Sequence, residues 1–172
     1  MNRNLWVYDI ETLKSCWTYS AINVDTLEKV QFVLHKDRFE FLELVKHLEE
    51  QCKGHNQETI ILELYQEAQR IIEEQNKENF NQIIAIKQSD ILIPQLDLFK
   101  LWHYNNLARS TSLKALEISM NYPNVMEMPI EHTRDDITLE EIPSILKYNM
   151  NDVLATFEFY KKSLAKIELR VS

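Results

Sequence analysis

The order of the apolar segments limits the folds open to this chain more than any other feature of its sequence. Three successive segments, 4–10, 16–24 and 29–35, are rich in aromatic and β-branched residues, and the turn sequence NVDT joins the last two. These features predict three strands that form an antiparallel meander. The chain contains a single glycine, Gly54, so its turns must rely on Asn, Asp and Pro.

The rest of the chain shows mainly helical signals. Capping boxes, in which an acid or a hydroxyl residue precedes Glu by three positions, occur at Asp37 and Thr138. The apolar run ILIPQLDLFKLW, residues 91–102, contains Pro94, and proline favours the start of a strand or an edge strand. We predict a strand over 91–102 and helices over 37–51, 58–78, about 112–121 and 139–168, all within one mixed α/β domain, 1–172.

Charge and hydropathy argue against some classes of protein. The net charge of −8 argues against coating nucleic acid by bulk electrostatics, although cations bound in a site reverse the local sign. No apolar run approaches the ~20 residues that span a bilayer, and no cleavable signal is visible, so we expect a cytoplasmic protein without a membrane partner. We expect Cys16 and Cys52 to be reduced thiols, and the histidines at 35, 47, 55 and 132 to lie at the surface.

Two acids follow the apolar run of the first predicted strand. In the stretch LWVYDIET, Asp9 and Glu11 are two residues apart, so their side chains project from the same face. Two carboxylates on one face repel each other, and a hard divalent cation with oxygen ligands stabilises both in the ionised form. Alone, this pattern is more typical of a strand end that faces solvent.

The C-terminal helix carries a second polar pattern. In KYNMNDVLAT, Tyr148 and Asp152 are four residues apart and therefore share a helix face. Val153, Thr156 and Phe157 continue a largely apolar pattern, which places Asp152 beside the buried stripe. An acid pair on a first strand combined with a late Tyr-x-x-x-Asp helix is a specific arrangement.

The two motifs together resemble a known family. VYDIET is similar to motif I, and YNMND to motif III, of the DEDD superfamily of 3′–5′ exonucleases, in the branch with Tyr before the final Asp. The His branch would have His at position 147, which is Lys here. The stretch QLDLFKLWHYNNLARSTSLKALE also resembles proofreading exonuclease domains of bacteriophages. The resemblance implies an RNase H-like fold, a mixed sheet with strands one to three antiparallel, residues 4–10 central and helices on both faces.

The implied activity is two-metal hydrolysis of phosphodiester bonds in DNA. By the resemblance, Asp9 bridges two Mg²⁺ or Mn²⁺ ions, Glu11 and Asp152 complete the ligand shells, and Tyr148 orients the attacking water. The implied substrates are single-stranded or frayed DNA 3′ ends. The implied role is phage-type DNA replication or repair, with a polymerase or another replication protein as partner.

Several further residues are candidates for nucleic-acid contacts. Trp102 and His103 can stack on bases, although Trp102 also fits a packed aromatic residue. Arg109 and Lys114 flank the start of a helix that can bind a phosphate, or that is simply capped at the surface. Thr12, the last residue of the motif I stretch VYDIET, is included with them.

The fourth carboxylate of the family is missing from the expected place. A stretch reading Asn-x-x-x-Phe-Asp normally lies between motifs I and III, but the sequence around Gly54 contains no such stretch. The segment is missing from this sequence, or it was lost by a true deletion, or an acid such as Glu58 replaces it. The alternative function is therefore a catalytically inactive exonuclease-fold module that regulates or binds a replication complex.

Overall fold

The structure, a computed structural model, describes residues 4–51, 58, 61–62, 95–103, 111–131 and 133–171. Nearly all of the predicted helix over 58–78, the sequence around Gly54 and Arg109 lie outside these residues. The chain divides into two compact units, one formed by Met1–Phe41 with Asp97–Ser172 and the other by Leu42–Leu96. The two units are described separately, and the single-domain organisation stays a prediction.

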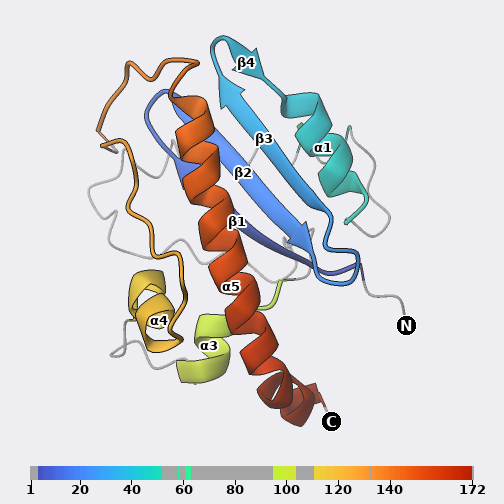
Figure 1. The fold of residues 1–172 in the computed structure, drawn as a ribbon. Coiled ribbons are helices and arrows are strands. Elements are labelled where there is room, and N and C mark those ends of the chain that lie inside the picture. The colour runs from blue at the N-terminus through green and yellow to red at the C-terminus, as the bar shows by residue number, and fades with distance from the viewer. Residues whose placement is uncertain are drawn as a thin grey trace, which may run out of the picture. The chain divides into compact units, whose positions relative to one another are not determined.

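The first unit contains an antiparallel sheet of four strands in the order β1-β2-β3-β4 (Figure 1). The predicted meander is confirmed, and the described part of the chain is mixed α/β. In the described part of the chain, β1 is an edge strand of this sheet, so the prediction that residues 4–10 form a central strand is wrong there. The strands are β1 (Trp6–Thr12), β2 (Cys16–Asn23), β3 (Lys29–His35) and a short β4 (Arg38–Phe39).

One long helix, α5 (Ile142–Val171, 30 residues), packs across β1 and β2. Figure 1 shows it crossing the sheet, as the sequence predicts for 139–168. It begins later than predicted, and Glu141 accepts a hydrogen bond from the backbone N–H of Thr138 at 2.9 Å just before it. Pro143 is the second residue of α5, where a helix needs no N–H donor.

Strand alternation decides which side chains face α5. Asp9 pairs with Ser20, and Glu11 pairs with Thr18, which bonds to Asn149 on α5. Apolar residues flank these acids at alternating positions along the strands and form two core clusters, one on each side of the acids. One core cluster contains Leu13, Cys16, Val33, Ile130, Ile137, Ile142, Ile145 and Leu146, and the other contains Val7, Ile22 and Val153.

Two short helices pack against α5. They are α3 (Leu98–His103) and α4 (Leu113–Ser119), which lie beside its lower half in Figure 1. The predicted start of α4 is confirmed, since the Ser112 side chain accepts a hydrogen bond from the backbone N–H of Ala115. The strand predicted over 91–102 is wrong for residues 98–102, because a short apolar run does not distinguish a strand from a buried helix.

Helix α1 (Phe41–Glu49) belongs to the second unit except for its first residue, and its buried residues include Leu44 and Val45. The helix begins later than residue 37, so the capping box predicted at Asp37 is wrong. Glu40 instead accepts a hydrogen bond from the backbone N–H of Val33 at 3.0 Å and pairs with Arg38. The acid therefore closes the β3–β4 hairpin and not a helix end.

Turns in this glycine-poor chain use other residues, as predicted. The Asn23 side chain accepts hydrogen bonds from the backbone N–H groups of Asp25 and Thr26 in the β2–β3 turn. Leu27 closes that turn with φ at 60°, a conformation that glycine adopts at lower cost. None of the described helices has the length and apolarity that a membrane span needs.

Candidate metal centre

Three carboxylates from the two ends of the chain meet between the sheet and α5. Asp9 and Glu11 extend from β1, Asp152 extends from α5, and one oxygen of each lies within 4.8 Å of the others. The predicted convergence of these side chains is confirmed. Each carboxylate is partly buried, so its position is set by the packing of α5 on β1 and not by solvent.

A buried asparagine holds this arrangement together. Asn149 on α5 is fully buried, and its Nδ2 donates a hydrogen bond of 2.6 Å to Oδ2 of Asp9. Its Oδ1 accepts a hydrogen bond of 3.3 Å from the Thr18 hydroxyl on β2. The two bonds fix the amide orientation and connect both strands to the helix at the level of the acids.

The carboxylates raise one another's affinity for protons. Burial, followed by the charge of Asp152, raises the pKa of Asp9 to about 6, although the Asn149 bond opposes the shift. Burial and the charges of Asp9 and Asp152 raise the pKa of Glu11 to about 7. Burial also raises the pKa of Asp152. The cluster therefore favours any positive charge that enters it.

Tyr148 lies one helical turn before Asp152 and is buried. Burial, the charge of Asp152 and a hydrogen bond to that carboxylate raise the pKa of the Tyr148 hydroxyl. The hydroxyl therefore keeps its proton at neutral pH. It can donate to Asp152 and accept from a water, but it cannot act as a general base.

The donor set fits a hard divalent cation. All the converging ligand atoms are carboxylate oxygens, which suit Mg²⁺ or Mn²⁺ better than softer metals. Mutual repulsion among the three acids, seen in the raised pKa values of Asp9 and Glu11, is relieved when a cation binds. That these residues bind metal stays a prediction.

The predicted nucleic-acid residues have different environments. Lys114 on α4 forms an ion pair with Glu127, and its charge lowers the pKa of Asp152. Trp102 donates its indole N–H to Ser163, and Lys166 lies 3.7 Å from the centre of its ring, so this residue packs on α5. Thr12 is exposed at the end of β1, and α3 contains His103.

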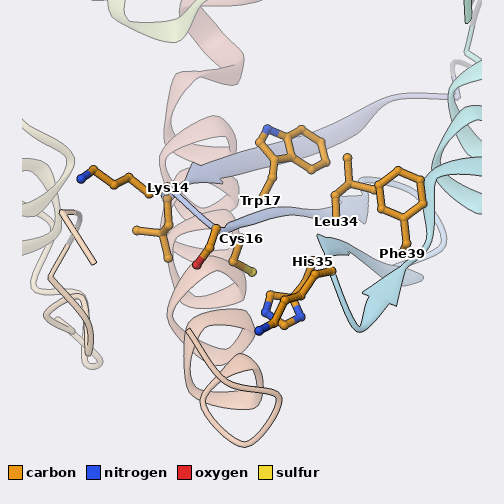
Figure 2. A pocket seen from close by; sticks show the side chains of 9 residues that line it. Lys14, Cys16, Trp17, Leu34, His35 and Phe39 are labelled. Carbon is orange, nitrogen blue, oxygen red and sulfur yellow. The ribbon is translucent and has the colours of Figure 1, made fainter. Parts of the chain in front are cut away.

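A separate hollow of about 350 Å³ lies where β1 connects to β2 (Figure 2). None of the three converging acids lines it. In Figure 2 Lys14 points away from Cys16 and His35. His35 and His47 are both buried, contrary to the prediction that the histidines lie at the surface. Bonds to Ile137 O and the Asp37 N–H occupy both ring nitrogens of His35. Cys16 pairs with His35 across the sheet and also lines the hollow, but the two bonds leave neither ring nitrogen of His35 for its thiol.

Three further buried polar residues were not predicted from the sequence: Asn149, Thr18 and Glu117. Asn149 stands between Tyr148 and Asp152 in the helix motif, three residues before the acid and on the same face. That position was the available signal for Asn149. No comparable signal marks Thr18, because its role depends on strand register.

Replacing Asn149 by Ala should destabilise the protein by about 2–3 kcal/mol, because buried partners lose hydrogen bonds, one of them to a charged group. Urea unfolding in excess chelator measures the change. Lys147→Ala, an exposed neighbour on the same helix, serves as the control and should change stability by less than about 0.5 kcal/mol. Equal effects of the two changes would contradict the bridging role of Asn149.

Comparison of the chain with family models, curated proteins and solved structures finds no match.

Proposed function

We propose that this protein is a metal-dependent 3′–5′ exonuclease that acts on DNA. The observation that carries the proposal is the convergence of Asp9, Glu11 and Asp152 beside Tyr148. These residues correspond to three of the four acids, and to the tyrosine, of the DEDD exonucleases that the two sequence motifs resemble. The antiparallel strands with a C-terminal helix across them support an RNase H-like fold.

Each side chain has a defined task in the proposed reaction. Asp9, Glu11 and Asp152 would hold the divalent cations, which would activate a water and stabilise the charge on the scissile phosphate. Asn149 keeps the Asp9 carboxylate in place through its hydrogen bond. Tyr148, protonated and bonded to Asp152, orients the water that attacks the phosphorus. Lys114 lies close enough to influence Asp152 and can attract the DNA backbone.

The substrate in this proposal is the 3′ end of a single strand or a frayed duplex. The net charge of −8 disfavours binding along a long stretch of DNA. The proposed enzyme would instead contact the DNA end through the metal ions held by its acids, which reverse the local charge. The associated polymerase or replication protein is part of the same proposal, and it rests on the family resemblance alone.

Digestion of a 5′-labelled single-stranded oligonucleotide tests the function. With Mg²⁺ or Mn²⁺ we expect a ladder of products that shorten one nucleotide at a time from the 3′ end, and no products in excess chelator. Circular single-stranded DNA, which has no end, should remain intact. An absence of metal-dependent digestion under all conditions would favour the inactive interaction module instead.

A further inference from the structure

A row of three apolar side chains crosses the sheet at the hollow of Figure 2. Trp17, Leu34 and Phe39 line this hollow and occupy paired positions on β2, β3 and β4, so their side chains share one face of the sheet. Figure 2 shows Leu34 between the two rings. Phe39 is 69% exposed, and Trp17 and Leu34 are partly exposed. A contiguous apolar surface of this kind indicates a binding site more strongly than scattered apolar residues do.

The spacing of this row suits a flat ring. Neighbouring strands lie about 4.8 Å apart, so Trp17 and Phe39 flank Leu34 at a separation of roughly 9.6 Å. A planar group above Leu34 would then lie about 4.8 Å from each ring, within the roughly 4.5–7 Å range of stacked aromatic rings. Each ring is also held by another ring of the protein, since Trp17 stacks with Tyr19 at 6.5 Å and Phe39 with Phe41 at 6.0 Å.

Two lysines line the same hollow. Lys14 lies in the connection between β1 and β2, and Lys36 lies in the turn between β3 and β4. In an antiparallel meander these two connections are at the same end of the sheet. Both lysines are exposed, and neither forms an ion pair with the described part of the chain. Their flexible stems can therefore bring two ammonium groups to an anion at this end of the row.

The acids of the β3–β4 hairpin do not cancel this charge. Glu40 forms an ion pair with Arg38, which leaves Asp37 as the acid of the hairpin that opposes Lys14 and Lys36. The edge of the hollow therefore keeps positive charge in excess, in a chain whose net charge is −8. A ligand that joins a flat ring to an anion complements both the row and the lysines.

The row lies on the sheet face away from the metal centre. Thr18 bonds to Asn149 on α5 and pairs with Glu11 on β1, so these residues share the α5 side of the sheet. Strand alternation places the neighbouring Trp17 on the opposite face. A ligand in the hollow would therefore leave the three acids free.

We propose that the hollow binds a nucleotide, with the base between Trp17 and Phe39 above Leu34 and the phosphate at Lys14 and Lys36. Aromatic rings beside cations hold bases and phosphates without reading the sequence. The hollow has a volume of about 350 Å³, within the range of roughly 300–1,000 Å³ that small-molecule sites occupy. A free nucleoside monophosphate and a nucleotide within a DNA strand share this chemistry.

Titration of the isotope-labelled full-length protein with deoxyadenosine monophosphate tests the stacking. Excess chelator keeps metal from the acids, and the readout is the nuclear magnetic resonance signal of the Trp17 indole N–H, identified by its loss in Trp17→Phe. We expect a saturable shift, and a dissociation constant about fivefold or more larger for Phe39→Leu. Phe39→Tyr, which keeps the ring, should bind as the natural protein does. Leucine keeps the apolar bulk, so this contrast assigns the effect to the ring.

The phosphate contact is tested with the two lysines. Replacing Lys14 and Lys36 together by Ala should weaken binding of the monophosphate by roughly threefold or more. Binding of deoxyadenosine, which has no phosphate, should not change. Lys29→Ala is the matched control, because Lys29 is an exposed lysine at the other end of β3.

An oligodeoxyadenosine strand in chelator identifies the source of the nucleotide. Tighter binding of the strand than of the monophosphate assigns the hollow to DNA, and equal or weaker binding assigns it to the free nucleotide. The proposal is overturned if neither ligand gives a saturable shift, or if Phe39→Leu binds both as tightly as the natural protein. If Phe39→Leu does not fold, unchanged binding by the double lysine variant overturns it instead. None of these results requires digestion of DNA, so a failure of the proposed exonuclease is a separate result.

Discussion

Asp9→Asn should lower metal-dependent digestion of DNA by roughly three orders of magnitude or more. Asp9 is one of the three acids proposed to hold the cations, and cation stabilisation of the transition state is worth several kcal/mol, with each 1.36 kcal/mol equal to a factor of ten. The rate of 3′-end digestion at saturating Mn²⁺ measures the effect. Asp25→Asn, at an exposed turn, is the control and should retain full activity.

The same substitution should stabilise the metal-free protein at pH 8. The pKa of Asp9 is raised to about 6 in the folded state, so the folded protein holds this proton more tightly than the unfolded chain does. Stability therefore falls as pH rises from about 4 to 6, and the loss remains above pH 6. Asn carries no such charge, and we expect a gain of about 1–3 kcal/mol at pH 8 that disappears at pH 4.

Urea unfolding in chelator at the two pH values checks this result. If Asp9→Asn gains stability but loses activity, Asp9 acts as a metal ligand. A residue that the fold requires would instead lose stability when it is replaced. If Asp9→Asn were instead less stable at pH 8, Asp9 would not belong to a cluster of repelling acids.

Mn²⁺ should raise the melting temperature at pH 8 and have little effect at pH 5. At a Mn²⁺ concentration of 100 times the dissociation constant, binding to the folded state adds about 2.7 kcal/mol, or roughly 5–10 °C for a chain of this size. At pH 5 the cation must displace protons from Asp9 and Glu11, whose pKa values are about 6 and about 7.

Thermal unfolding across this pH range, at constant ionic strength, measures the difference. Asp9→Asn should show no Mn²⁺-dependent shift at either pH, which excludes binding elsewhere on an acidic surface. An equal shift at pH 5 and pH 8 for the natural protein would show that the cation binds groups other than these acids.

The sheet and the acid cluster were predictable because local rules determine both. Alternation along β1 places Asp9 and Glu11 on one face, and helical spacing places Tyr148 beside Asp152. The strand boundaries follow from β-branched and aromatic residues that end at turn sequences. These features need no knowledge of the rest of the chain.

The remaining parts depend on tertiary contacts that sequence patterns do not contain. Periodicity counts Asn149 and Glu117 as polar and hence exposed, yet both are buried between α5 and its neighbours. The helical state of residues 98–103 likewise comes from packing against α5. Whether helices cover both faces of the sheet stays a prediction, because the Leu42–Leu96 unit is described separately.

The hydrogen bond between Asn149 and Asp9 joins residues that are 140 positions apart. During translation, Asp9 is therefore made long before the residue that holds it in place. Ribosomes add about 5–20 residues per second, so roughly 7–28 s separate the synthesis of the two residues. The strand pairings within the β1–β2–β3 meander join neighbouring segments of the chain and can form early. A nascent or truncated chain therefore carries Asp9 and Glu11 without Asp152, and the proposed nuclease stays inert until the last helix has left the ribosome.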